Sequence, residues 1–199
     1  MVLRTVTRWL TPTGYTLAVL CFLLPFVSVS CDAPGGYGRV VPGGTTSYTG
    51  LDLATGGAPT IDDRTLRPAA QRRDDRLNPQ PLAVVALVVL LVAVGSAAGL
   101  RAVRLRRGVA ALAGLLAAVL LLANQAVAES AVEDRLTAQL TVPLPAGKAA
   151  TDYVQTGSGF GFALILTGLL VVGNAIGWWR ARPRVTGRAP GAAPLPPPR

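Results

Sequence analysis

The sequence contains no histidine, and this absence removes several kinds of chemistry at once. Histidine is the commonest general base, a member of the serine-protease triad and a frequent metal ligand. Acidic residues are also scarce, and the pairs Asp62-Asp63 and Asp74-Asp75 each lie beside arginine without the ligand spacing of a calcium loop. No glycine-rich loop joins a strand to a helix, so no nucleotide site is expected. The sequence therefore predicts no catalytic residue, no metal site and no cofactor.

Cysteine is almost absent as well, with two residues in the chain. If the segment between them is helical, Cys21 and Cys31 lie about 15 Å apart, whereas bridged Cα atoms lie within about 7 Å. The expected outer loops hold no other cysteine, so no disulfide is predicted within the chain. Cys31 is accordingly expected to be an outer thiol that is free, modified or paired with another molecule.

Charge is missing from four long apolar runs, and each is long enough to cross a hydrocarbon core about 30 Å thick, which needs roughly 20 helical residues. The runs are Trp9–Ser30, Leu82–Leu100, Gly108–Ala128 and Gly159–Trp179. They predict a membrane all-α bundle of four transmembrane helices, residues 9–30, 82–100, 108–128 and 159–179. The segments between and around them are 1–8, 31–81, 101–107, 129–158 and 180–199.

The charges that are present divide sharply between the segments. Residues 1–8, 101–107 and 180–199 hold eleven arginines and no acid, whereas all ten acidic residues lie in 31–81 and 129–158. A basic stripe in a soluble chain would suggest nucleic acid, but positive charge beside apolar runs marks cytoplasmic segments instead. We therefore expect no nucleic acid as a partner, both termini and the short arginine link inside, and the two longer loops outside. Trp9, Trp178 and Trp179 lie at the inferred inner boundary, where tryptophan is favoured.

The phrase "FVSVSCD" at 26–32 has two interpretations. Arg4 and Arg8, an apolar stretch and the small Ser30 before Cys31 match a lipoprotein signal. Ser28 occupies the position where such signals usually carry an aliphatic residue, and the run from Trp9 is longer than the roughly 7 to 15 apolar residues of a signal peptide. An uncleaved membrane helix ending at Ser30 is the favoured interpretation, and lipidation at Cys31 is the alternative.

The two outer loops carry strand patterns. Residues 37–53 have β-branched and aromatic residues on both sides of Pro42-Gly43-Gly44, which predicts a β-hairpin. Residues 135–142 alternate apolar and polar side chains, and residues 149–156 can return as the second strand of another hairpin. Because an isolated hairpin is marginally stable in water, we expect the two to pair into a small outer β-sheet cap.

Two sets of residues inside the apolar runs are candidates for helix packing. Small residues at four-residue spacing let helix backbones approach closely, and they favour tight packing within the bundle, with homo-oligomerisation as the alternative. The glycines concerned are Gly95, Gly99, Gly114, Gly157, Gly161, Gly173 and Gly177. The intramembrane polar residues Asn124, Gln125 and Asn174 are expected to form hydrogen bonds between helices. No ionisable group that would indicate a proton or ion path lies in any run.

The segments "LPFVSVSCDAPGG" with "YTGLDLATGG" and "GSGFGFALILTGLL" resemble a group of uncharacterised bacterial four-helix membrane proteins. The order of long and short loops is also similar to claudin-type tetraspan proteins in topology only, because the tryptophan and paired cysteines of their first loop are missing. The bacterial resemblance implies a tetraspan with an outer β-cap and supplies no activity. The many arginines with one lysine, and the abundant Ala, Gly and Pro, suit a GC-rich bacterial genome.

These patterns predict a multi-pass protein of the cytoplasmic membrane with a disordered Pro/Arg-rich tail at 180–199. The predicted function is a non-catalytic interaction or accessory component of a bacterial envelope complex. The predicted partners are the lipid bilayer and a membrane or envelope protein. The alternative is a component of a membrane transporter or membrane enzyme with an outward-facing polar cavity.

Overall fold

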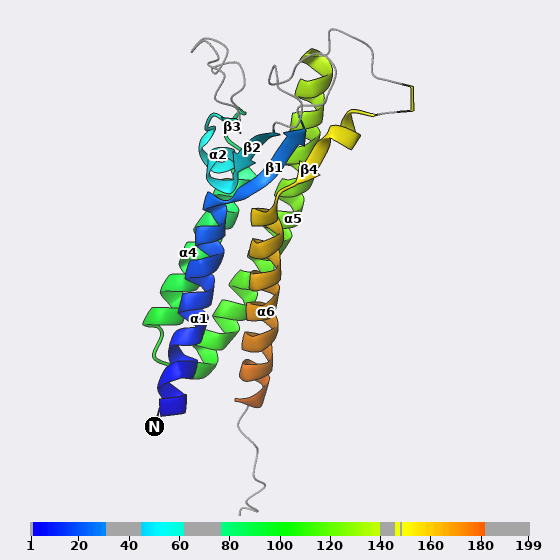
Figure 1. Cartoon of the computed structure of the whole chain (residues 1–199). Helices are drawn as coiled ribbons and strands as arrows, with labels where there is room; N and C mark the ends of the chain where they lie inside the picture. Colours follow the sequence, from blue (N-terminus) through cyan, green and yellow to red (C-terminus); the bar gives the residue numbers. More distant parts are fainter. Residues whose placement is uncertain (1, 31–44, 62–76, 140–145, 148, 182–199) are drawn as a thin grey trace, which may run out of the picture.

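The structure is a computed structural model of the whole chain, and it describes residues 2–30, 45–61, 77–139, 146–147 and 149–181. Its described part is a bundle of four long helices with a small β-sheet at one end (Figure 1). The helices are α1 (Val2–Leu20), α4 (Pro81–Gly99), α5 (Val103–Gln139) and α6 (Ser158–Arg180). We call the end that carries the sheet the sheet end. The opposite end, with the start of α1, residues 101–107 and Arg180, is the arginine end; α5 begins at Val103, so most of the predicted 101–107 link is helical.

Three of these helices are long and apolar enough to cross a membrane, by length and composition. They are α4, α5 and α6; α4 and α6 match their predicted runs to within one residue, whereas α5 contains its run and extends beyond it at both ends. The first run contains a shorter apolar helical stretch, Trp9–Leu23, within the described residues. That α1 also crosses the bilayer therefore stays a prediction, although it lies along α4 and α6 in the bundle (Figure 1).

The helices carry small residues inside and large aliphatic residues outside. Many of the buried residues between them are alanines: Ala83, Ala86, Ala93, Ala97, Ala110, Ala117, Ala128 and Ala163. By contrast, Leu112, Ile165 and Leu169 are each more than 60% exposed. An exterior of this kind is far more apolar than a water-soluble surface and suits a lipid environment.

The first helix ends ten residues earlier than predicted. α1 stops at Leu20, a single 3₁₀ turn follows at η1 (Cys21–Leu23), and Pro25–Ser30 form strand β1. The predicted α-helix over 9–30 is therefore wrong over residues 21–30. Pro25 lacks the N–H that a helix interior needs, and the alternation of Val27 and Val29 with serine has the two-residue period of a strand.

β1 is a central strand of a four-stranded antiparallel sheet in the order β3-β2-β1-β4. β2 is Thr45–Thr49, β3 is Thr60–Ile61 and β4 is Val154–Thr156. The prediction that the two loops join in one sheet is confirmed, but the two hairpins are not the units that build it. β2 and β4 both pair with β1 instead. The strand predicted before Pro42 lies outside the described residues.

α5 is 37 residues long, so at 1.5 Å per residue it extends for about 55 Å and exceeds the roughly 30 Å hydrocarbon core. The strand predicted at 135–142 is wrong over 135–139, which belong to this helix, and residues 140–142 lie outside the described part. Ala128, Val132 and Leu136 are buried at a spacing of four, which is a helical face. The alternation of apolar and polar residues over 135–142 covers too few residues to distinguish a strand from one face of a helix.

The segment "YTGLDLATGG" forms β2 and the short helix α2 (Gly50–Thr55). Thr49 and Asp52 form a capping box: the Thr49 hydroxyl accepts from the Asp52 amide at 3.1 Å, and the Thr49 amide donates to Asp52 Oδ2 at 3.0 Å. Gly56 ends the helix in the left-handed conformation with φ of 75°. These local signals fold the chain back onto the bundle, where Gln80 N donates to the Leu53 carbonyl at 2.8 Å.

Candidate functional site

Glycines bring the backbones of the sheet and the helices together at the sheet end. A Cβ on Gly157 or Gly159 would overlap the backbone of Pro25, and one on Gly50 would come within 2.9 Å of the Phe22 and Phe26 rings. Phe26 in turn packs against Phe22 and Phe160, with ring centroids 5.1 and 6.1 Å apart. The segments that contain Phe26, Gly50 and Gly157 are far apart in the sequence and meet at one place, which we call the sheet–helix junction.

Hydrogen bonds close the same junction. The Phe26 carbonyl accepts from the Gly157 amide at 2.7 Å and from Gln125 Nε2 at 3.3 Å. Gln125 Nε2 also donates to Glu129 Oε1 at 2.8 Å, and the Thr156 hydroxyl donates to the same oxygen at 2.7 Å. One carbonyl of β1 and one carboxylate of α5 thus tie β1, β4 and α5 together beside the start of α6.

The two faces of the sheet differ in the burial and polarity of their side chains. On the packed face, which looks toward the outer part of α5, the cross-strand partners are buried: Val27, Val29, Thr46 and Tyr48. Thr156 lies on this face opposite Val27 and reaches Glu129 of α5. Burial on one side fixes the strand register, because a slip of one residue would move these side chains to the other face.

The open face carries a row of uncharged polar side chains. Ser28 of β1 is directly opposite Ser47 of β2 and Gln155 of β4, and Ser47 is opposite Thr60 of β3. Directly paired residues share a face, so these four form one line across all four strands. Thr60 and Gln155 are exposed, and the two serines are half-buried. We call this line the polar row.

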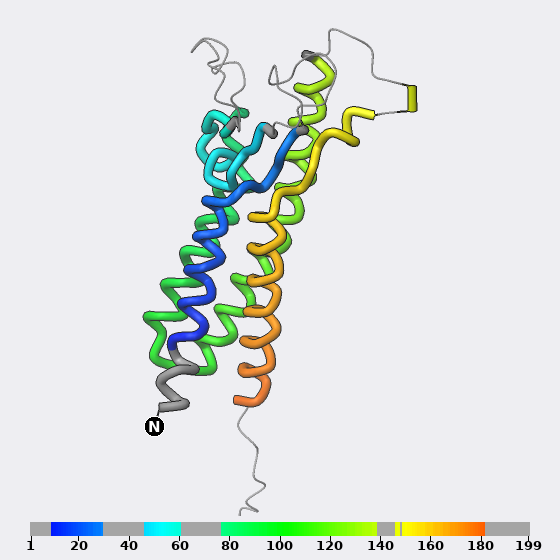
Figure 2. The backbone as a smooth tube through the Cα atoms, in the orientation of Figure 1, coloured from blue at the N-terminus to red at the C-terminus, as the bar shows by residue number. Residues whose placement is uncertain are grey.

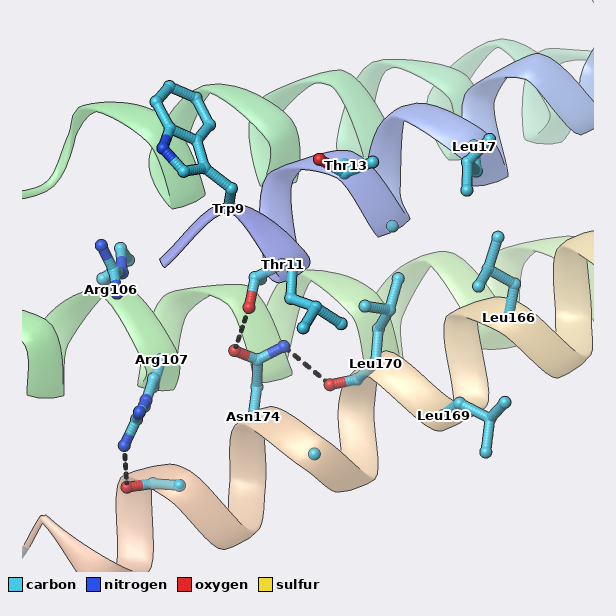
Figure 3. Close-up of a pocket in the computed structure, with 14 residues that line it drawn as sticks. Trp9, Thr11, Thr13, Leu17, Arg106, Arg107, Leu166, Leu169, Leu170 and Asn174 are labelled. Atoms are coloured by element: carbon cyan, nitrogen blue, oxygen red, sulfur yellow. Dashed lines mark hydrogen bonds between the residues drawn. The ribbon is translucent and has the colours of Figure 1, made fainter. Parts of the chain in front are cut away.

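At the arginine end a lateral groove of about 860 Å³ lies between α1 and α6 (Figure 3). These two helices diverge toward this end of the bundle (Figure 2). Leu17, Leu166, Leu169 and Leu170 line one part of the groove, and Arg106 and Arg107 of α5 line the other. Arg107 Nη1 donates to the Gly177 carbonyl at 2.9 Å, which fixes its guanidinium against α6.

The predicted packing glycines fall into two groups. Gly114, Gly157 and Gly177 lie against a neighbouring element: Tyr15 and Val171, the Pro25 backbone, and the Arg107 side chain, respectively. At Gly95, Gly99, Gly161 and Gly173 a Cβ would meet nothing within 4 Å. The expectation of tight packing within the bundle does not hold at these four, because the close approaches are made by the buried alanines instead.

The predicted polar residues are not brought together in one site. Asn174 lies in the groove, where its Nδ2 donates to the Leu170 carbonyl at 2.7 Å and its Oδ1 accepts from the Thr11 hydroxyl at 3.4 Å (Figure 3). Gln125 serves the sheet–helix junction. Asn124 is 1% exposed, and its Oδ1 has no hydrogen-bond partner among the described residues.

No metal site is visible among the described residues. No group of three or more His, Cys, Asp or Glu side chains gathers there. Cys21 is a free thiol, and the predicted outer thiol Cys31 lies outside the described residues. The sequence interpretation missed the polar row and the groove. The "VSVS" alternation could have revealed the first, whereas the second depends on how the helices diverge.

Comparison with known proteins adds no relative from which a role could be transferred: no protein-family model matches the chain, and no curated protein matches it significantly.

Proposed function

We propose that the chain is a multi-pass protein of the bacterial cytoplasmic membrane that serves as a non-catalytic accessory component of an envelope complex. Its open sheet face is the surface that recognises a protein partner. In this proposal the sheet lies outside, and both termini and the 101–107 link lie inside. The resemblance to uncharacterised bacterial tetraspan proteins belongs to the same proposal.

The polar row is the observation that carries this proposal. Ser28, Ser47, Gln155 and Thr60 present hydroxyl and amide groups at fixed cross-strand spacing on a face that no described element covers. The packed face and the sheet–helix junction hold these groups in place, so little side-chain and loop entropy is lost when a partner binds. A rigid, uncharged surface with many hydrogen-bonding groups favours specific recognition of another protein.

The charge distribution supports the orientation. Among the described residues, the acidic side chains Asp52, Glu129, Glu133, Asp134 and Asp152 belong to the sheet end. The 101–107 link and Arg180 supply positive charge at the other end. Cytoplasmic loops carry an excess of arginine and lysine, which favours placing the sheet outside.

The alternative, a transporter or enzyme component, requires an outward-facing polar cavity. Asn124 and Gln125 line neither the groove nor the small pocket of about 280 Å³ beside Gln80 and Arg135 at the sheet end. Asn174 faces the groove at the opposite end. No specific observation on the described residues therefore favours this second role.

The test is site-specific photo-crosslinking in native membranes. A photoreactive residue is placed at Gln155 in the polar row, and a matched one at Thr137, which is exposed at the same end on α5 but outside the sheet. We expect one envelope protein to be captured from position 155 and not from position 137, with mass spectrometry identifying it. Capture of lipid and the chain itself alone, from both positions, would contradict the proposal.

A charge-substitution pair gives the second measurement. Ser28→Arg with Ser47→Arg places two cations on the open face, and Thr137→Arg places one beside it. We expect the double variant to lose the crosslink while the control keeps it, because buried unpaired charge at an interface is costly. Retention of the crosslink by the correctly folded double variant would remove the polar row from the interface.

A further inference from the structure

The groove at the arginine end has the size and shape of a ligand site and opens sideways. Its volume of about 860 Å³ falls within the range of roughly 300 to 1,000 Å³ that is usual for small-molecule sites. Leu10, Leu17 and Leu169 at its walls are 59%, 49% and 67% exposed. In a membrane these side chains face acyl chains, so the groove is accessible from the bilayer.

The polarity of the groove changes steadily along the helix axis. Arg106 and Arg107 lie at its outermost level, Thr11 and Asn174 at the next, and Leu170, Leu166 and Leu17 further in (Figure 3). Gly177, whose carbonyl accepts from Arg107, belongs to the outermost level. At 1.5 Å per residue, Asn174 lies about 4.5 Å inward of Gly177, and Leu166 about 12 Å further. A phospholipid has the same order of groups: a phosphate, then ester carbonyls, then a hydrocarbon chain.

The hydrogen-bonding capacity of the groove is partly unused. Arg106 makes no side-chain hydrogen bond or ion pair with a described residue, although it lines the groove, whereas Arg107 donates to Gly177. Asn174 Nδ2 has one described acceptor, the Leu170 carbonyl, and an amide nitrogen carries two donor hydrogens. The groove therefore offers a free cation at the phosphate level and a spare donor at the ester level.

We propose that this groove binds one anionic glycerophospholipid from the leaflet at the arginine end. Its phosphate pairs with Arg106 and with the remaining donors of Arg107. Asn174 donates to an ester carbonyl, and one acyl chain lies between α1 and α6 along Leu17, Leu166 and Leu170. Charge complementarity decides the headgroup, because the lining contains two arginines and no acidic residue.

A second copy of the chain is a poorer occupant on the same grounds. In a shared membrane a neighbouring copy would present its own arginine end at the same level. The described residues at this end supply arginine and no acid, so the two copies would repel each other there. A lipid phosphate would neutralise the positive charge at this end, whereas a second copy would add to it.

The experiment compares two glycine variants of one helix. Gly173 lines the groove and Gly161 does not, and a Cβ on either meets nothing within 4 Å. Gly173→Leu should fill the groove, whereas Gly161→Leu should add the same side chain elsewhere on α6. The full chain is reconstituted in vesicles of equal phosphatidylglycerol and phosphatidylcholine, extracted, and examined by native mass spectrometry for retained lipid.

We expect the parent chain and Gly161→Leu to retain one phosphatidylglycerol and Gly173→Leu to lose it. Arg106→Gln, which removes the charge without filling the groove, should lower retention about fivefold and erase the preference over phosphatidylcholine. Equal retention of both lipids by the parent, or unchanged retention by a folded Gly173→Leu chain, would overturn the proposal. A dimer that Gly173→Leu breaks without any change in lipid would assign the groove to a second copy. If Gly173→Leu does not fold, Arg106→Gln decides the question by itself.

Discussion

The two ends of the bundle differ in what lies opposite some of their glycines. At the sheet end, Gly157 and Gly159 lie against the Pro25 backbone, and Gly50 lies under two phenylalanine rings. At the arginine end, Gly173 faces the open space of the groove. Gly177, at the same end, lies against the Arg107 side chain, so the arginine end holds both a packed glycine and an open one. Glycine content alone does not indicate packing, and what lies opposite each glycine decides its role.

Hydrogen bonding also differs between the sheet end and the groove at the arginine end. The sheet–helix junction is closed by bonds of 2.7 to 3.3 Å around Phe26 and Glu129. In the groove, Thr11 reaches Asn174 at 3.4 Å, and the Arg106 side chain has no hydrogen bond or ion pair to a described residue. The sheet end is built to stay fixed, which suits a recognition surface, and the arginine end has unused bonding capacity for a ligand.

The largest expected effect is at the closed end. Gly157→Ala places a methyl group against the Pro25 and Phe26 backbone, which cannot move without breaking the β1–β4 pairing. We expect a loss of about 3 kcal/mol in unfolding free energy or failure to fold, since overpacking against a fixed backbone is among the costlier changes. Gly161→Ala, one helical turn later, should leave thermal stability in detergent unchanged or slightly raised. Equal melting temperatures for the two variants would show that the backbone opposite Gly157 does not limit what this position tolerates.

A substitution in the middle of the bundle should lower the unfolding free energy by an intermediate amount. Tyr15 donates to the Ala110 carbonyl at 2.6 Å, which holds its hydroxyl over Gly114 between α1 and α5. Gly114→Ala should cost about 2 kcal/mol, because the added methyl meets both this hydroxyl and Val171. Gly95→Ala on α4 meets nothing within 4 Å and serves as the control in the same denaturation measurement. A loss at Gly95 as large as that at Gly114 would show that packing between described helices is not the cause.

The smallest expected losses of stability come from removing one hydrogen-bonding side chain at each end of the bundle. Glu129→Ala removes the acceptor shared by Gln125 and Thr156, and we expect a loss of about 1 kcal/mol. Thr11→Val removes a hydroxyl whose contact with Asn174 is 3.4 Å long, so stability should change by less than about 0.5 kcal/mol. Chemical denaturation of both variants measures the difference. A larger loss at Thr11 would reverse our ranking of the two ends.

Much of the helical fold could be predicted from the sequence. Three apolar runs without charge agree with α4, α5 and α6 to within a few residues at most ends, because burial of apolar residues in lipid requires a helix that satisfies its own backbone. Local capping signals such as Thr49, Asp52 and Gly56 could also be recognised from residue spacing. These features depend on residues that are close together in the sequence.

The end of the first run and the outer part of α5 were not predicted, for a common reason. Both Pro25–Ser30 and 135–139 have short side-chain patterns that fit either a strand or a helix, and their state depends on what they pack against. β1 gains partners from β2 and β4, which lie about 20 and 130 residues away in the chain. Residues 135–139 continue a buried stripe that begins at Ala128. Short segments of this kind are decided by tertiary contacts.

The sequence by itself determined the apolar runs, the separation of acidic residues from the arginine-only segments, and the lack of histidine. All three are properties of composition along the chain. Only the tertiary structure decided that the serines of "FVSVS" lie on the open face of a sheet, and that Arg106 and Asn174 line one groove. Those placements depend on strand register and on the divergence of two helices, and both are set by contacts between residues far apart in the sequence.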